Sequence, residues 1–328
     1  MARSVTVRRE AWPIRGSFRI SRGVKTEAEI IVVEIEGGNA VGRGECVPYA
    51  RYGETVASVV AEIEGVCSEI ANGMTRHELQ QRMPAGAARN ALDCALIDWQ
   101  AKASGTPAYA LLNLPAPQPV RTAYTLSLDS PDAMANAAAE AVRSFRLLKL
   151  KIASGKDLSR VEAVRRAAPD ARLIADANEG WSPDDLIRLA PELARLGVAL
   201  LEQPLKADAD GMLKSYKSPL PLCADEGCHT RADLPRILGR YTHINVKLDK
   251  TGGLTEALAL VKEANVQGLR HMVGCMVATS LAMAPATLLT AGADFVDLDG
   301  PLLLQRDRDP SLIYQHDLIL PPSPALWG

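Results

Sequence analysis

Residues 147–151 read LLKLK, a short apolar run that ends in a lysine and is the first of five such runs. The next four are LIAD at 173–176, ALLE at 199–202, PLCAD at 221–225 and INVK at 244–247. The charged residues that end these runs lie 22 to 26 residues apart, which is the length of a strand, a helix and their two loops. This spacing predicts successive parallel strands with a charged side chain at each carboxyl end, where barrel enzymes build their active sites.

The strand pattern continues on both sides of this core and predicts eight strands. They are residues 121–128, 146–151, 172–176, 198–202, 220–225, 243–247, 271–275 and 294–299. The helices between them begin at N-cap residues such as Ser130 and Ser182, each followed by Pro-Asp, and end at glycines such as Gly197. Eight strands alternating with helices predict an α/β fold of the TIM-barrel type. An open doubly wound sheet is the alternative, which the absence of GxGxxG after the first strand disfavours.

The first third of the chain has a different pattern. Residues 4–9 and 28–36 read as strands, and Gly37-Gly38-Asn39 predicts a hairpin turn into a third strand at 40–46. Helices follow, and the proline-rich segment 113–119 marks a boundary. A length of 328 residues also favours two domains. We expect the apolar tail beyond residue 301 to pack back on the first domain.

The composition narrows the class of protein. The net charge is −2 and no stretch is strongly basic, so neither nucleic acid nor an anionic membrane surface is expected as a partner. The N-terminus has no apolar core of signal-peptide length, and no apolar run is long enough to span a bilayer. The six cysteines form no CxxC pair, so we interpret them as small buried thiols in a reducing compartment.

Three of the charged strand ends are carboxylates, namely Asp176, Glu202 and Asp225. Neighbouring strands lie about 4.8 Å apart, so these side chains would converge and repel one another strongly. A cation makes such a cluster tolerable, and a site with oxygen ligands and no His or Cys favours a hard ion, Mg²⁺ first. The alternative is that these acids cap helices or form salt bridges.

Lysines flank the three carboxylates on both sides. Lys149 and Lys151 point the same way because strand side chains alternate, and Lys247 ends a strand on the far side of the eight-stranded ring. Nearby positive charge lowers the proton affinity of a lysine, which suits it as a general base near neutral pH. Two opposed bases can remove a proton from one side of a carbon and return it on the other. Salt bridging to the same carboxylates, or a Schiff-base lysine, are the alternatives.

Two further features face the predicted mouth of the barrel. Asp297 and Asp299 end the eighth strand on one side of it, and a pair of acids attracts a cation such as a substrate ammonium group. They could instead cap the turn that follows. Residues 17–25 form a polar, basic loop that could close over the mouth and meet an anionic group through Arg22 or Lys25, although a solvated turn explains it equally well.

The barrel motifs together resemble those of the enolase superfamily, in the branch of muconate lactonising enzyme, and among them the dipeptide epimerases. The matching stretches are KLKI at 149–152, DANEGW at 176–181, LEQPL at 201–205, CADEGCH at 223–229, INVKLDKTGGLTEAL at 244–258 and DLDG at 297–300. The resemblance implies a (β/α)7β barrel, a modified TIM barrel, over residues 119–304. It also implies an α+β capping domain over residues 1–118 that the tail, residues 305–328, completes.

The resemblance further implies a reaction: 1,1-proton transfer at the α-carbon of the C-terminal residue of an acidic dipeptide. One Mg²⁺ per subunit would be bound, with Mn²⁺ as the alternative ion, and a homo-oligomer is compatible with the family. The setting implied is reuse of murein peptides in the cytoplasm. The implied roles are metal ligation by Asp176, Glu202 and Asp225, proton transfer by Lys151 and Lys247, and substrate binding by Lys149, Asp297, Asp299 and Arg22.

Other functions share this scaffold. Cycloisomerisation or an elimination of the o-succinylbenzoate synthase type would use the same metal and lysines, although the Asp297 and Asp299 pair favours an amine in the substrate. A barrel that binds metal and ligand without turnover is a third interpretation, and it needs neither of the opposed lysines.

Overall fold

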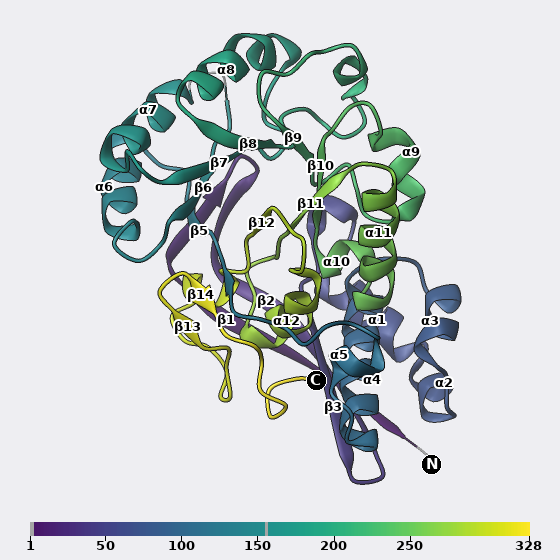
Figure 1. Cartoon of the computed structure of the whole chain (residues 1–328). Helices are drawn as coiled ribbons and strands as arrows, with labels where there is room; N and C mark the ends of the chain where they lie inside the picture. The colour runs from purple at the N-terminus through teal and green to yellow at the C-terminus, as the bar shows by residue number, and fades with distance from the viewer. Residues whose placement is uncertain (1–2, 155–156) are drawn as a thin grey trace.

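The computed structural model describes residues 3–154 and 157–328, and its central element is an eight-stranded parallel sheet (Figure 1). The strands neighbour one another in chain order: β5 (Tyr124–Leu126), β6 (Leu147–Lys151), β7 (Arg172–Asp176), β8 (Val198–Glu202), β9 (Leu222–Ala224), β10 (His243–Val246), β11 (Arg270–Val273) and β12 (Phe295–Val296). The backbone N–H of Ala123 donates to the carbonyl oxygen of Val296 at 2.8 Å, which joins the first strand to the last. The eight predicted strands are confirmed, several of them shorter at their ends.

Seven connections cross between these strands, so the barrel is (β/α)7β as expected. The connecting helices are α6 (Pro131–Ala141), α7 (Leu158–Ala167), α8 (Pro183–Arg195), α9 (Leu234–Ile237), α10 (Leu248–Thr251), α11 (Leu254–Val266) and α12 (Ser280–Ala286). Between β8 and β9 the connection contains only the 3-10 turn η2 (Gly211–Lys214). The hydroxyls of Ser130 and Ser182 accept from backbone N–H groups in the first turns of α6 and α8, which confirms both predicted N-caps.

A compact apolar layer fills the barrel below the charged strand ends. Its members are buried residues of five strands: Ile174, Leu200, Cys223, Met272 and Phe295. Ile174 and Leu200 lie two residues before Asp176 and Glu202, and side chains two apart in a strand share a face. The charged groups therefore lie directly above a buried apolar layer, and the low polarity of such surroundings strengthens their electrostatic interactions.

The capping domain contains a three-stranded antiparallel sheet of β1 (Ser4–Ile20), β2 (Gly23–Gly37) and β3 (Ala40–Cys46). Helices α1 (Val56–Glu64), α2 (Cys67–Ala71), α3 (Arg76–Arg82), α4 (Ala87–Ser104) and α5 (Ala108–Leu111) follow it. The sheet packs closely on α4, and a Cβ atom on Gly44 would lie 2.1 Å from the carbonyl oxygen of Ala91. The predicted hairpin turn at residues 37–39 is confirmed.

The segment 17–25 differs from the expected loop. Strands β1 and β2 continue through most of it, with Phe18 paired to Lys25 after a bulge, so that only residues 21 and 22 form the turn. The backbone pairing persists because the hairpin tip rests on the barrel, where the hydroxyl of Ser21 donates to the carbonyl oxygen of Asn178 at 3.0 Å. In Figure 1 the hairpin, in purple, reaches from the capping domain to the barrel strands.

The C-terminal tail crosses from the barrel to the capping domain. Strand β14 (Leu318–Ile319) lies between β13 (Tyr314–Gln315) and β4 (Val120–Arg121) and pairs with both. Further along, the indole N–H of Trp327 donates to the carbonyl oxygen of Cys94 at 3.1 Å. The tail thus packs on α4, as expected. The division of the chain between residues 118 and 119 stays a prediction.

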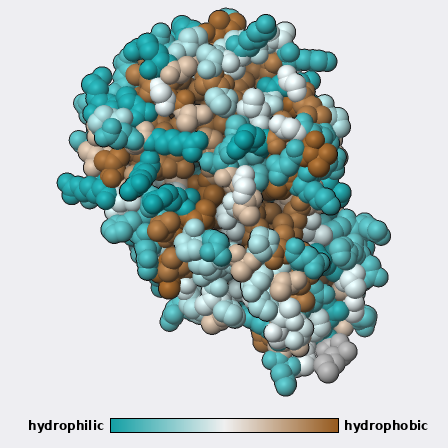
Figure 2. Space-filling model, in the orientation of Figure 1, coloured by the Kyte–Doolittle hydropathy of each residue, from teal (hydrophilic) through white to brown (hydrophobic). Residues whose placement is uncertain are grey.

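Two expectations from composition can be compared with the described residues. In that part of the chain no helix is both long and apolar enough to cross a membrane. All six cysteines are free thiols, and Cys46, Cys94, Cys223 and Cys228 are buried. Figure 2 shows mostly hydrophilic side chains over one face of the molecule, with hydrophobic side chains visible near its middle.

Candidate active site

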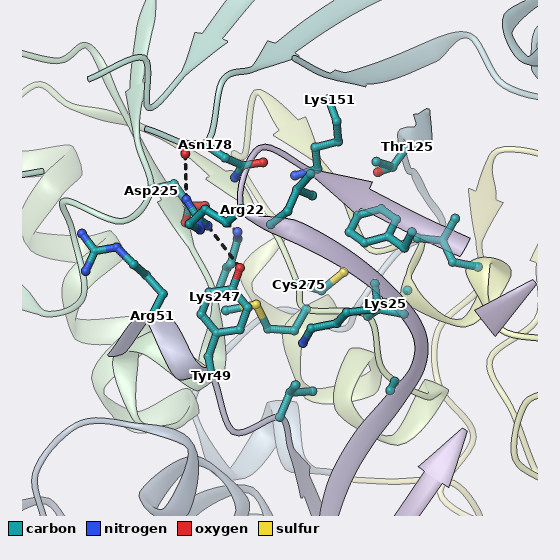
Figure 3. A pocket seen from close by; sticks show the side chains of 18 of the residues that line it. Arg22, Lys25, Tyr49, Arg51, Thr125, Lys151, Asn178, Asp225, Lys247 and Cys275 are labelled. Atoms are coloured by element: carbon teal, nitrogen blue, oxygen red, sulfur yellow. Dashed lines mark hydrogen bonds and ion pairs between the residues drawn. The ribbon is translucent and has the colours of Figure 1, made fainter. Parts of the chain in front are cut away.

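A cavity of about 490 Å³ lies between the tip of the β1–β2 hairpin and the carboxyl ends of the barrel strands (Figure 3). The barrel contributes charged side chains to its lining, among them Lys149, Lys151, Asp225, Lys247, Asp297 and Asp299. The capping domain contributes Phe18, Ile20, Arg22, Lys25 and Tyr49. Both domains are therefore needed to form the cavity.

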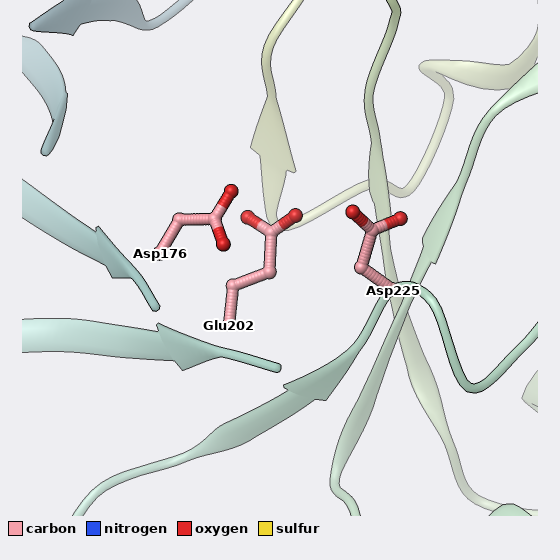
Figure 4. A group of neighbouring side chains, drawn as sticks. All are labelled: Asp176, Glu202 and Asp225. Carbon is pink, nitrogen blue, oxygen red and sulfur yellow. The ribbon is translucent and has the colours of Figure 1, made fainter. Parts of the chain in front are cut away.

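The three predicted metal ligands converge beside this cavity (Figure 4). Asp176 and Glu202 are register partners at the ends of β7 and β8, and Asp225 directly follows β9. One oxygen of each carboxylate lies within 4.8 Å of the other two, and all three residues are at most 1% exposed. An all-oxygen group of this kind fits a hard divalent ion.

The same three acids are electrostatically unequal. Burial and the neighbouring charge of Asp176 raise the pKa of Glu202 to about 7. Burial opposes ionisation of Asp176 too, but Lys151 and Lys149 lower its pKa to about 2. Asp225 is likewise held well below its usual pKa by Lys247 and Lys250, against the effect of burial. The pKa of Glu202 is therefore raised even though lysines pair with all three acids, and a cation bound among their oxygens would favour its ionised form.

Lys151 and Lys247 lie on opposite sides of the carboxylate group, as the strand positions predict. The Nζ atom of Lys151, at the end of β6, is 2.6 Å from Asp176, and that of Lys247, after β10, is 2.6 Å from Asp225. Burial would lower the pKa of Lys247, but the charge of Asp225 raises it above the usual value. A cation bound to the same carboxylates would compete with the lysines for them and weaken this effect.

Lys149 connects the two predicted groups of acids. Its Nζ atom, on a side chain that is 1% exposed, lies 2.8 Å from Glu202, 2.9 Å from Asp297 and 3.2 Å from Asp176. Burial opposes the charge on Lys149, yet these carboxylates, Asp297 foremost, raise its pKa well above the usual value. From the sequence, the three predicted metal ligands and the pair Asp297 and Asp299 are interpreted as separate groups. The buried ammonium group of Lys149 contacts acids of both.

Asp297 and Asp299 both reach the cavity, as their period-two spacing predicts. The backbone N–H of Thr125 donates to Asp299 at 2.6 Å, and the Thr125 hydroxyl donates to Asp297 at 3.3 Å. Burial and the charge of Asp297 raise the pKa of Asp299 to about 7. The pair therefore has unsatisfied negative potential that a cationic group in the cavity would relieve.

Arg22 lies at the cavity, but it is already engaged. Its guanidinium donates to Glu226 at 2.7 Å, to the carbonyl oxygen of Asn178 at 2.7 Å and to the hydroxyl of Tyr49 at 3.1 Å. The contacts with Asn178 and Tyr49 are drawn as dashed lines in Figure 3. These contacts fasten the hairpin tip to the barrel. They do not show the ligand contact that the sequence suggested for this residue.

The structure adds residues that the sequence did not single out. The Nζ atom of Lys250, on α10, donates to Asp225 Oδ1 at 2.7 Å and to two backbone carbonyls, while Asn245 donates to Glu202 at 2.7 Å. Asn245 lies two residues before Lys247 on β10, so the alternation of side chains could have indicated it. Lys250 lies beyond the strand, and no sequence pattern predicts that its side chain turns back.

A capping domain over a (β/α)7β barrel, with three carboxylates between two lysines, is the architecture of a class of acid–base enzyme. Two protein-family models match the chain, one for each of these two parts. Residues 2–113 match the mandelate racemase / muconate lactonizing enzyme N-terminal domain, and residues 133–315 match the enolase C-terminal domain-like family. The chain therefore belongs to the enolase superfamily.

Its relatives in this superfamily are named epimerases and racemases, which are isomerases. The chain is 49% identical over 311 residues to L-Ala-D/L-Glu epimerase of Escherichia coli strain K12, covering 94% of this chain and 97% of the relative. It is 45% identical over 301 residues to N-acetyl-D-glutamate racemase of a Pseudoalteromonas species, covering 91% and 95%.

Two solved structures that resemble this chain are of a dipeptide epimerase and of a protein with homology to dipeptide epimerases. An enolase family member from Agrobacterium tumefaciens, with homology to dipeptide epimerases and with bound sodium and L-Ala-L-Glu, has a TM-score of 0.97 and 51% identity. That match covers 99% of this chain and 100% of the other. Dipeptide epimerase from Enterococcus faecalis V583, complexed with Mg and L-Leu-L-Tyr, has a TM-score of 0.90 and 30% identity over 98% of both chains.

Proposed function

We propose that this enzyme epimerises the C-terminal residue of acidic dipeptides, interconverting L-Ala-L-Glu and L-Ala-D-Glu by transfer of the α-proton. The observation that carries the proposal is the placement of Lys151 and Lys247 on opposite sides of one carboxylate group in one cavity. A carbon held between two such bases can lose a proton to one and receive a proton from the other. The names of the relatives support the same reaction.

Asp176, Glu202 and Asp225 would hold the metal ion, which we propose is one Mg²⁺ per subunit, with Mn²⁺ as the alternative. When bound, the ion supplies positive charge that stabilises the negative charge formed as the α-carbon loses its proton. A neutral lysine, Lys151 or Lys247, takes that proton, and the protonated lysine on the other side donates one to the opposite face of the carbon. The two lysines therefore exchange protonation states in each turnover.

The remaining side chains would orient the dipeptide. Asp297 and Asp299 offer a buried anionic pair for its free ammonium group, and Lys149 lies where it can balance the charge of its carboxylate. For Arg22, contact with the acidic side chain stays a prediction. The setting that we propose is reuse of murein peptides in the cytoplasm, and a homo-oligomer is compatible with this function.

A second candidate comes from the relative named N-acetyl-D-glutamate racemase, with which the chain is 45% identical. An N-acetylated amino acid has the same acidic side chain and α-proton but no free ammonium group. The acid pair favours the dipeptide because Lys149 pairs with Asp297 alone, and Asp299 forms no ion pair among the described residues, so a substrate ammonium group would give this buried acid a cationic partner. Comparison of the two substrates separates the candidates.

The test is incubation in D₂O with Mg²⁺ and either L-Ala-L-Glu or N-acetyl-L-glutamate, followed by NMR of the glutamyl α-carbon. We expect deuterium uptake and epimerisation with the dipeptide, and no epimerisation with Lys151→Ala or Lys247→Ala. Lys262→Met, which changes an exposed lysine of α11, is the matched control and should behave as the wild type. Turnover of the N-acetyl compound alone would favour the second candidate, and absence of exchange with both would refute epimerisation of these acids.

A further inference from the structure

Six cationic side chains line the active-site cavity, and five of them are paired with a carboxylate. The paired ones are Arg22, Arg51, Lys149, Lys151 and Lys247, with nitrogen-to-oxygen distances of 2.6 to 2.8 Å. The sixth is Lys25, whose side chain forms no hydrogen bond and has no carboxylate within 4.0 Å among residues 3–154 and 157–328. Its charge is therefore available to an anion that enters the cavity.

Arg22 is a poor receptor for such an anion. Two carboxylates lie beside it, Glu226 at 2.7 Å and Glu179 at 3.5 Å, and they would repel a third. Displacing Glu226 would leave a buried carboxylate without its cationic partner, which is costly. We therefore interpret Arg22 as the group that fastens the hairpin tip over the cavity.

Lys25 lies on the face of the hairpin that looks into the cavity. It is the cross-strand partner of Phe18, and directly opposed residues of antiparallel strands project to the same side. The ring of Phe18 lies 5.9 Å from the Nζ atom of Lys151, so this side faces the proposed site of proton transfer. The Nζ atom of Lys25 lies 5.4 Å from the ring centre of Tyr49, a cation–π contact that holds the long side chain over the cavity (Figure 3).

The cavity also has apolar walls. Ile20, Met276, Val277 and Leu303 line it together with Phe18, the cross-strand partner of Lys25. Such an apolar surface can pack against the methylene groups of a glutamyl side chain. Without the Lys25 ammonium group it would bind a neutral apolar side chain equally well. The charge at position 25 therefore distinguishes the two kinds of substrate.

We propose that Lys25 is the specificity-determining residue that receives the side-chain carboxylate of the dipeptide's C-terminal residue. This inference rests on the proposed epimerase function and deepens it, since it assigns the preference for acidic dipeptides to one side chain. It also assigns different roles to the two cations of the hairpin, with Arg22 positioning the tip and Lys25 selecting the substrate.

The experiment compares L-Ala-L-Glu with L-Ala-L-Gln, which has the same shape but no side-chain charge. For wild type, Lys25→Met, Lys25→Arg, Arg22→Met and the control Lys262→Met, kcat/KM is measured for both dipeptides by polarimetry. We expect Lys25→Met to lower the Glu-to-Gln ratio by about tenfold or more, the size of one lost charge-assisted hydrogen bond. Lys25→Arg keeps the charge and should keep most of the ratio, as should Lys262→Met.

The outcomes separate this inference from the proposed function. If the wild type epimerises L-Ala-L-Glu and Lys25→Met keeps the wild-type ratio, the role of Lys25 is refuted while the epimerase function stands. A ratio lost in Arg22→Met but kept in Lys25→Met would make Arg22 the receptor and would also refute it. If the wild type epimerises neither dipeptide, the proposed function itself fails, and the inference fails with it.

Discussion

Asp249, a buried acid outside the active site, allows a sharp test of the electrostatics of the domain contact. It lies on α10 of the barrel, is 6% exposed, and accepts two hydrogen bonds from the capping domain. The donors are the backbone N–H of Val47 at 3.1 Å and the side-chain amide of Asn90 at 2.8 Å, and both bonds go to Oδ1. An Asp249→Asn change can keep both bonds because the amide oxygen of asparagine can accept them.

The expected magnitude follows from the pKa of this group. Burial, with the charges of Glu54 and Glu45, raises the pKa of Asp249 from 3.8 to about 7. A raised carboxyl pKa stabilises the fold below the unfolded value, and this contribution is lost as pH rises through the folded value. A shift of about three units corresponds to about 4 kcal/mol in total, of which the part between about pH 5.5 and pH 7 is about 2 kcal/mol.

The assay is urea unfolding of the wild type and Asp249→Asn at about pH 5.5, 7 and 8.5. We expect the variant to become more stable relative to the wild type by about 2 kcal/mol between the first and the last pH, with most of the gain below about pH 7. Comparing the two proteins at each pH removes the effect of all other titrating groups. A difference in unfolding free energy that does not change with pH would refute the reasoning.

Three further predictions concern the metal site and the packing. Mg²⁺ at about 100 times its dissociation constant should raise the unfolding free energy, measured by urea titration, by about 2.7 kcal/mol over a sample in EDTA. Asp225→Asn should remove this increase. An equal increase in the variant would show that the ion binds elsewhere. Trp327→Ala should cost about 3–5 kcal/mol in the same titration, because its 1% exposed ring fixes the tail to α4, and an unchanged urea midpoint would contradict this. Gly44→Ala should lower the unfolding free energy by the upper end of about 1–3 kcal/mol, because the added carbon forces β3 away from α4. Gly211→Ala, which places no atom within 4 Å of the added carbon, is the control and should leave the unfolding free energy unchanged. Similar losses in both variants would show that the close packing at Gly44 is not the cause.

The sequence predicted the barrel because its evidence is local and periodic. The interval between charged strand ends gave the repeat of the barrel, and the two-residue period within strands gave the face on which each charge lies. Together these rules placed Asp176, Glu202 and Asp225 beside one another, and the structure brings their oxygens within 4.8 Å. The same period brought Asp297 and Asp299 to one cavity.

Where the predictions from sequence were wrong or missing, the contacts that decide the structure follow neither the strand repeat nor the two-residue period. The segment 17–25 reads as a polar loop, and it continues as paired strands because its tip meets the barrel. Lys250 turns back to Asp225 from a short helix whose direction no residue pattern reveals. Lys149 reads as one member of a lysine pair, yet its side chain contacts acids at the carboxyl ends of three other strands.

What the sequence by itself determined is the order of strands and the set of ionisable groups at their carboxyl ends, because both depend on spacing along the chain. Which of those groups neutralise one another was decided only by the tertiary structure. Arg22 forms an ion pair with Glu226, which is 204 residues away in sequence. Lys25, only three residues after Arg22, forms no ion pair with any carboxylate among the described residues. Charge pairing depends on distance in space and on exclusion of water, and a linear sequence records neither.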